Sequence, residues 1–357
     1  MQLKKKINNL NRLYIIFFYS VLFINFIFAT SSSENSFKIT NLKISEPFEL
    51  NFNKEKVINK GFKIAFLELA SMITTSGDKK KIENTSLSKI KGLIDSFTMS
   101  DERFLNNEYH VKFDVNFNKK NTLKFFESEN IFPSIPIKKD LLLIPVMVDL
   151  QLNKISLFNK NIFYKKWNNN NERHYLLNYI LPSEDLEDLG LLSQNSQSIE
   201  DYDFKQVIRK YDLNDFIITI IYKNNDRITT LSKIQLNQFI KVDNKKFESI
   251  DLFKEKDLNL IIVNLKNTYE NYWKSINQIN TSIKLPLTIS IDATQHKKIR
   301  ILEHALNELD LVSNFEILRL NNNNIYFKII YNGSPNRFIS EIKSKGVEIN
   351  TENQIWE

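Results

Sequence analysis

The sequence contains no cysteine among its 357 residues. Disulfide bonds, thiolate nucleophiles and cysteine-ligated zinc are therefore excluded. A lipoprotein anchor is excluded as well, because it needs a cysteine at the processing site. A chain of this length can bury enough apolar surface to fold without disulfides.

Glycine is also scarce, with six residues, and none of them form a GxG pair. The sequence thus lacks both the dinucleotide-binding fingerprint and the phosphate-binding loop. A GxSxG elbow, the commonest hydrolase signature, is absent too. Among the four histidines, His296 and His304 are eight apart on one predicted helix, about 12 Å by the helical rise, which is too far to share a metal ion. We therefore predict no catalytic, cofactor-binding or metal-binding residue and a protein that is not an enzyme.

The net charge of +7 is the composition's one hint of a nucleic-acid partner. Residues 1–31 contain four basic and no acidic residues, so the rest of the chain carries only +3. Lysine and glutamate are mixed throughout this remainder, whereas nucleic-acid binders concentrate their basic residues on one face. The sequence therefore predicts a solvated surface and no nucleic-acid partner.

Leu13–Ala29 is an almost continuous apolar run that follows Lys4, Lys5, Lys6 and Arg12. A cationic head followed by an apolar core is the layout of an export signal. The run has about 17 residues, between the usual signal core and the roughly 20 residues that cross a bilayer. We predict that 1–31 is a cleaved signal peptide and that the protein is periplasmic. A retained inner-membrane anchor is the alternative, and only then would Leu13–Ala29 provide membrane contact.

The remaining pattern predicts an α+β protein built from three small α/β units. We expect an α+β module over 37–132, an α/β sandwich unit over 137–250, a long connecting amphipathic helix over 254–280 and a ferredoxin-like βαββαβ unit over 283–357. On the long helix, Tyr269, Tyr272 and Trp273 follow the helical period, so we interpret this aromatic stripe as core.

The first unit is predicted from one strong helix and one strong strand. Apolar residues recur at three- and four-residue spacing from Asn53 to Thr74, which is typical of an amphipathic helix. Apolar and polar residues alternate over Tyr109–Phe117, which indicates a half-buried strand. We expect Phe97–Phe104 to pair with this strand across a turn at Asn106-Asn107.

The second unit is predicted from apolar runs. Leu141–Val148 (LLLIPVMV) is typical of a buried central strand, although Pro145 should impose a strand end or a bulge because proline cannot donate a ladder hydrogen bond. Tyr175–Leu181 reads as a second buried strand. We expect Pro182-Ser183 to open a helix that runs through Leu192, and Phe216–Tyr222 to form a hairpin with residues 228–236.

The last unit shows the clearest order of elements. A strand over 283–291 is followed by a helix through Leu309 that Thr294 can cap. A hairpin then joins 314–320 to 325–331. Ser334 as N-cap, Pro335 at the first helical position and Gly346 at the end define a second helix. Either 347–349 or the stretch to Trp356 should close the sheet.

The one dense group of carboxylates is Glu184, Asp185, Glu187 and Asp188. Such a group can bind a cation or supply an acid/base pair. Acidic residues in the first turn of a helix also interact favourably with the helix dipole, and we prefer this explanation. A hydrolase-like envelope enzyme that uses Asp185 or Asp188 stays open as an alternative.

Several segments resemble the bacterial domain of unknown function 2066 family of exported Gram-negative proteins. These segments are AFLELASMITTSGD (65–78), YHVKFDVNF (109–117), LKFFESENI (123–131), LLLIPVMVD (141–149), YILPSEDLEDL (179–189), VIRKYDLNDFIITII (207–221) and NNIYFKIIYNGSPNRFISEIKSKGVEI (323–349). The chain is poorer in Ala, Gly and Arg than that family. The resemblance implies an exported envelope protein and supplies no catalytic residue.

Export, the missing active-site signatures and the small α/β units together predict a non-enzymatic cell-envelope interaction or assembly factor. Its expected partner is an unidentified envelope protein. The alternatives are the hydrolase-like enzyme and an inner-membrane-tethered scaffold.

Overall fold

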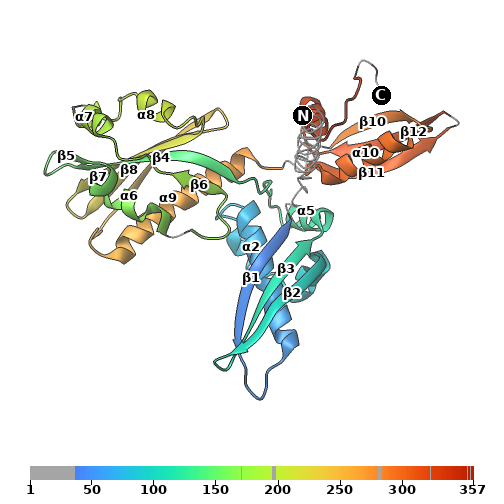
Figure 1. Cartoon of the computed structure of the whole chain (residues 1–357), viewed down its shortest axis with the longest axis horizontal. Helices are drawn as coiled ribbons and strands as arrows, with labels where there is room; N and C mark the ends of the chain where they lie inside the picture. Colours follow the sequence, from blue (N-terminus) through green and yellow to red (C-terminus); the bar gives the residue numbers. More distant parts are fainter. Residues whose placement is uncertain are drawn as a thin grey trace, which may run out of the picture. The chain divides into compact units, whose positions relative to one another are not determined.

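The computed structural model describes residues 37–169, 171–194, 198–279, 284–321, 323–351, 353 and 355–357. The predicted signal segment, 1–31, lies outside these residues. The described part is mixed α and β, with three sheets and helices packed on them (Figure 1). This confirms the predicted α+β class. Among the described residues, no helix is both long enough and apolar enough to span a bilayer.

The first sheet is antiparallel, in the order β1-β3-β2. Its strands are β1 (Lys38–Pro47), β2 (Ile94–Leu105) and β3 (Glu108–Phe117). The predicted alternation in β3 is confirmed, because every second side chain is buried. The predicted turn is confirmed too, with φ values of 53° and 61° at Asn106 and Asn107.

The helices of this part surround the sheet's buried face. They are α2 (Lys54–Ile73), α3 (Lys79–Ile82), α4 (Leu87–Leu93) and α5 (Lys119–Ser128). The long helix α2 begins as predicted after Asn53, whose side chain accepts a hydrogen bond from the Glu55 backbone N–H. It ends at Thr74, whose hydroxyl donates to the Ala70 carbonyl.

The second sheet has six strands. The path runs β5 (Lys154–Ser156), β4 (Lys139–Asp149), β7 (Phe216–Asn224), β8 (Arg227–Leu236) and β9 (Phe239–Phe247), while β6 (Leu177–Ile180) also pairs with β4. Strand β4 is central and parallel to β6 and β7. The β7–β8 hairpin agrees with the sequence prediction, whereas the edge strand β9 was not predicted.

Helices cover both faces of this sheet (Figure 1). On one face lie α6 (Ile162–Lys166) and α9 (Glu255–Ile276), with η2 (Trp167–Asn169) beside them. On the other lie α7 (Leu186–Gln194), α8 (Lys205–Arg209) and η1 (Phe158–Lys160). Tyr269 and Trp273 of α9 are buried, as predicted for the aromatic stripe, and Tyr272 is half-buried. Helix α7 begins four residues later than Pro182, because Asp185 and not Ser183 caps it.

The expected strand end or bulge at Pro145 is wrong. Strand β4 passes through this residue without a register shift, and Pro145 pairs with Thr219 of β7. On the opposite side of β4, β6 pairs only up to Leu142 and β5 begins at Met147, so Pro145 lies in the gap between the two partners. Its carbonyl accepts a 3.0 Å hydrogen bond from the Asn161 side chain in that gap. The missing N–H of proline therefore costs the ladder no hydrogen bond.

The third sheet is antiparallel, in the order β10-β12-β11. It contains β10 (Leu285–Asp292), β11 (Val312–Leu320) and β12 (Asn324–Tyr331), with helices α10 (His296–Glu308) and α11 (Pro335–Ser344). The predicted Ser334 cap is confirmed, and Gly346 follows α11 with φ of +80°.

Two details of the third sheet differ from the sequence prediction. The N-cap of α10 is Gln295 and not Thr294, whose hydroxyl instead donates to Asp292 at 2.6 Å. After α11, the described chain pairs with the sheet through a single parallel bridge between Trp356 and Ile289.

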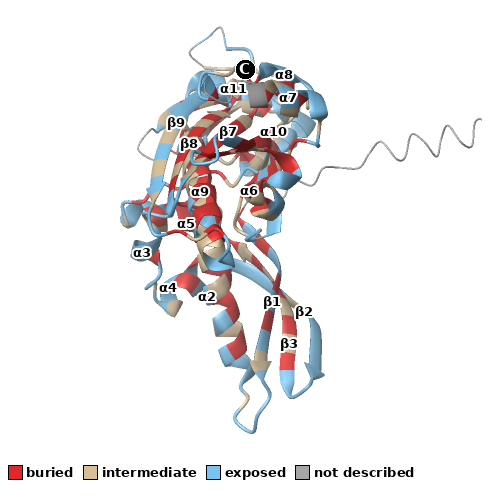
Figure 2. Ribbon diagram, turned by 90° about the vertical axis from the view of Figure 1, so that its left-hand side faces the viewer, coloured by how far each residue is buried: buried red, intermediate tan, exposed pale blue. Residues whose placement is uncertain are grey.

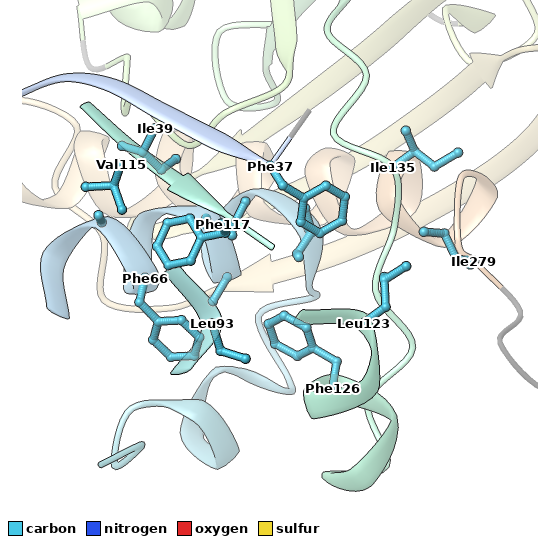
Figure 3. Packing of buried hydrophobic residues seen from close by; sticks show 14 of the residues in the cluster. Phe37, Ile39, Phe66, Leu93, Val115, Phe117, Leu123, Phe126, Ile135 and Ile279 are labelled. Carbon is cyan, nitrogen blue, oxygen red and sulfur yellow. The ribbon is translucent and has the colours of Figure 1, made fainter. Parts of the chain in front are cut away.

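One hydrophobic cluster is shared by the first and third sheets. Figure 2 shows its buried residues along β3 and α2 of the first sheet. Phe37, Phe117 and Phe126 belong to it together with Ile135 and Ile279 (Figure 3). Lys119 of α5 reinforces the connection, since its Nζ donates to the Leu309 carbonyl at 2.7 Å. The proline-containing segment 133–136, which separates two units in the sequence prediction, is largely buried here. The six-stranded sheet has its own two clusters, one on each face.

Candidate functional site

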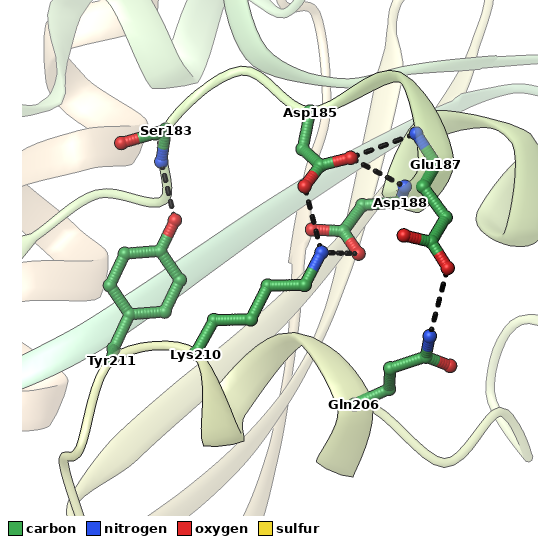
Figure 4. A network of polar contacts seen from close by, with 7 residues as sticks. All are labelled: Ser183, Asp185, Glu187, Asp188, Gln206, Lys210 and Tyr211. Carbon is green, nitrogen blue, oxygen red and sulfur yellow. Dashed lines mark hydrogen bonds and ion pairs between the residues drawn. The ribbon is translucent and has the colours of Figure 1, made fainter.

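The predicted acidic cluster is a salt-bridged network at the start of α7 (Figure 4). The Asp185 carboxylate accepts hydrogen bonds from the backbone N–H groups of Glu187 and Asp188, at 2.8 and 3.3 Å. Lys210, which follows α8, places its Nζ 2.8 Å from both Asp185 Oδ2 and Asp188 Oδ1. Glu187 accepts a 3.3 Å hydrogen bond from Gln206, and Glu184 bonds Asn159.

The ion pair between Asp185 and Lys210 stabilises the charged form of each group. The hydrogen bond from Lys210 lowers the pKa of Asp185, and the hydrogen bond to Asp185 raises the pKa of Lys210. A general acid needs a carboxyl group whose pKa is raised toward neutrality, which is the opposite direction. The Asp188 side chain is buried, and the cavity that it lines has a volume of only about 10 Å³, room for one water molecule at most. The cluster therefore ties α7 to α8 and offers no space for a substrate.

A second group of charges, which was not predicted from the sequence, lies on α9. Lys266, Glu270 and Lys274 are four residues apart, so they share one face of the helix. All three are buried. The sequence did contain a signal for this group, since its three charged residues lie on the same side of the helix as the predicted aromatic core. Charged residues are rarely buried in a core unless they have partners there.

Each of the three charged groups has a different set of partners. Glu270 Oε1 accepts the backbone N–H groups of Leu176 and Leu177 at 2.9 and 2.8 Å, while its Oε2 has no hydrogen-bond partner in the described part of the chain. Lys274 Nζ donates to the Ser71 carbonyl of α2 at 2.6 Å. Lys266 Nζ lies 3.2 Å from the Asn171 side chain.

Burial shifts the ionisation of all three groups away from the charged form. It raises the pKa of Glu270 and lowers the pKa of Lys274. The pKa of Lys266 falls to about 8, although the nearby Glu270 opposes this shift. Lys266 also lies 5.6 Å from the ring centres of Tyr175 and of Tyr179, so the two aromatic faces replace part of its lost hydration.

A cavity of about 400 Å³ opens beside this charged face, between α2 and α9. Polar groups from sequence segments 70–79, 172–175 and 267–274 converge on it. Asn271 of α9 joins its two sides, since its side chain exchanges hydrogen bonds with the Ser76 backbone N–H at 2.9 Å and the Ser76 hydroxyl at 2.8 Å. A volume of this size falls within the usual range for small-ligand sites of about 300–1,000 Å³.

A larger cavity, of about 730 Å³, lies between β10, α10 and residues 346–349. Its charged lining residues, Asp292, Lys298, Lys343, Glu348 and Glu357, are all exposed. The cavity between α2 and α9 differs because buried charges line it, and we therefore take it as the candidate functional site.

No group of three histidine, aspartate or glutamate side chains that could hold a metal ion occurs within the described residues. The sequence matches no family model and no curated protein. The resemblance to the domain of unknown function 2066 family thus stays a prediction.

Proposed function

We propose that this protein is an exported, non-enzymatic interaction factor of the bacterial cell envelope. One observation carries the proposal: each of the three sheets ends in an edge strand with exposed apolar side chains. These strands are β2, β9 and β11. Unpaired edges of this kind invite strand pairing with another chain, and monomeric proteins normally protect them.

Strand β9 shows the feature most clearly. Phe239, Ile240 and Val242 are exposed by 58%, 74% and 56%. Ile240 and Val242 share one face of the sheet, opposite Gln235 and Lys233 of β8. On the other edges, Phe104 of β2 and Leu320 of β11 are exposed in the same way.

The edge geometry favours partners that add an extended segment to a sheet. In this mode, backbone hydrogen bonds provide affinity and alternate side chains provide specificity. The second half of β9 adds Lys245 and Lys246 to the apolar pair of Ile240 and Val242. A segment with alternating apolar residues followed by an acidic group complements this edge.

Export is the second part of the proposal, and it rests on the sequence of 1–31 and on the resemblance to exported proteins. Fusion of residues 1–40 to an alkaline phosphatase reporter tests it, because that enzyme is active only outside the cytosol. We expect activity, and its absence would refute export. N-terminal sequencing of the mature protein then separates a cleaved signal from the inner-membrane-tethered alternative.

Site-specific photo-crosslinking tests the interaction. A photo-reactive amino acid at position 240 should capture a discrete envelope protein, whereas the same amino acid at the exposed, polar position of Lys205 should not. Identical cross-link patterns at both positions would show that the β9 edge is not a binding surface.

We also propose that the 283–357 unit is ferredoxin-like. The strand order β10-β12-β11 and the intervening helices support this assignment. In that fold, a right-handed crossover after β12 would place a last strand antiparallel to β10. The parallel bridge at Trp356 means that the chain reverses once more before it reaches the sheet.

A further inference from the structure

The cavity between α2 and α9 contains a buried ammonium group with spare hydrogen-bonding capacity. Lys274 is 5% exposed and lines this cavity. An ammonium group has three N–H donors. One of them is used by the Ser71 carbonyl, and the described residues form no other hydrogen bond with this group. Buried N–H donors without acceptors are costly in free energy. The two remaining N–H groups of Lys274 therefore favour a ligand that supplies acceptor atoms.

The surroundings of Lys274 restrict what that acceptor can be. Glu172 and Glu270 line the same cavity as Lys274 and Lys79, so the lining has as many carboxylates as ammonium groups. His174, the remaining titratable nitrogen, has a pKa lowered by burial and by the two lysines, which favours its neutral form. The two carboxylates repel a doubly charged phosphate more strongly than an anion with a single negative charge, to which Lys274 can donate hydrogen bonds.

The rest of the wall contains hydroxyl and amide side chains together with an apolar part. Leu67 and Ala70 of α2 and Val263 of α9 line the cavity. A ligand with a short hydrocarbon part therefore buries apolar surface against them when its charged end reaches Lys274.

We propose that this cavity binds a small molecule with one carboxylate group, which accepts hydrogen bonds from Lys274 while its aliphatic part packs on Leu67, Ala70 and Val263. Two sources share this chemistry: short aliphatic carboxylates and zwitterionic amino acids. In an amino acid, the ammonium group would bond Glu172. The inference goes beyond the interaction at β9 and does not depend on it.

Titration calorimetry on the full-length protein tests the proposal, with butyrate, leucine, butanol and inorganic phosphate as probes. Butyrate, leucine or both should bind, and butanol and phosphate should not. Binding of leucine alone identifies an amino-acid site, and binding of butyrate with leucine excluded identifies a simple carboxylate site. Failure of both carboxylates, or tighter binding of phosphate, overturns the proposal.

Variants locate the binding. Lys274→Met should weaken carboxylate binding at least tenfold, whereas Lys256→Met, at an exposed lysine of the same helix outside the cavity lining, should leave it within twofold. If Lys274→Met does not fold, Val263→Trp provides a second test, because Val263 is partly exposed and the larger ring fills the cavity. Unchanged binding in Val263→Trp would overturn the assignment. Substitution of Ile240 should not affect binding, which separates this test from that of the interaction at β9.

Discussion

At the scale of single residues, the surroundings of a lysine decide the direction in which its pKa moves. Lys210 contacts Asp185 and the buried Asp188, and its pKa rises. Lys266 is buried beside two tyrosine rings, and its pKa falls to about 8. Lys210 links two helices in its charged form. For Lys266, the charged form costs folding free energy, and this cost depends on pH.

Lys266→Met should therefore alter the pH dependence of stability. An unfolded lysine has a pKa of about 10.4. Between pH 8 and this value, the unfolded wild-type chain keeps a proton that the folded chain has lost. The free energy of unfolding should thus rise with pH in this window and fall as the pH drops through 8. The variant lacks this contribution.

Urea unfolding of both proteins at pH 7.5, 8.5 and 9.5 measures the difference. Wild type should gain stability relative to Lys266→Met as the pH rises. Lys205→Met, a substitution at an exposed lysine, is the control and should follow wild type. Parallel curves for wild type and Lys266→Met would contradict the argument.

Residue-level prediction from sequence worked where a local signal was enough. Ser334 acts on the backbone N–H of Arg337, three residues later, so its cap was visible in the pattern. The α2–α9 cavity was not visible, because Asn271 and Ser76 are 195 positions apart. The acidic cluster was found as a group, but its partner Lys210 was not, since it comes from another helix.

At the scale of secondary structure elements, apolar periodicity predicted the buried helices and strands. Strand β3 and helix α2 match the prediction within one residue at each end. Strand β9 was missed because its alternate residues are exposed on both faces, so it has no one-sided apolar pattern. Edge strands depend on their neighbours for pairing, and a single sequence does not show these neighbours.

Two glycines, one inside a helix and one just after a helix, provide a matched test of the backbone conformation. Gly92 lies inside α4, and a Cβ there would meet no atom within 4 Å. Gly92→Ala should stabilise the protein by about 0.5–1 kcal/mol through helix propensity. Gly346 follows α11 with φ of +80°, so Gly346→Ala should destabilise by about 1–2 kcal/mol. Urea unfolding of the two variants should give opposite signs, and a common sign would contradict the assigned backbone conformations.

At the scale of the described molecule, the cores do not follow the order of the sequence. Residues of the first and third sheets share one cluster, although the six-stranded sheet separates them in the chain. Lys119 and Leu309, which are hydrogen-bonded across this junction, are 190 positions apart. Periodicity assigns residues to elements but does not reveal which elements share a core, because that depends on long-range packing.

A cavity in the shared cluster should therefore weaken both sheets. Leu302 of α10 is 1% exposed, and Leu302→Ala should cost about 2–5 kcal/mol. Amide hydrogen exchange should accelerate in β3 as well as in β12, while β7 keeps its protection. Ile262→Ala is the control. Ile262 lies on α9, in the hydrophobic cluster between this helix and the six-stranded sheet, and its substitution should accelerate exchange in β7 first. Acceleration confined to the third sheet in Leu302→Ala would contradict a common core.

Pro145 has a consequence for the chain before it folds. Without it, Leu141–Val148 would be eight consecutive aliphatic and methionine positions with no charge, which is the composition of cross-β aggregates. Proline cannot join an intermolecular ladder on both sides, so it acts as a gatekeeper within the most deeply buried strand. Because Pro145 lies in the gap between β5 and β6, the native sheet loses no hydrogen bond through the proline.

Pro145→Val should accordingly raise light scattering when the protein is diluted from urea, because the newly synthesised or unfolded chain loses this protection. Pro136→Ala, outside the strand, is the control and should refold as wild type does. Equal scattering in the two variants would contradict the gatekeeper role. The interrupted pairing of a central strand is thus a protection against amyloid-like association, obtained at a position where the native sheet does not need the hydrogen bond.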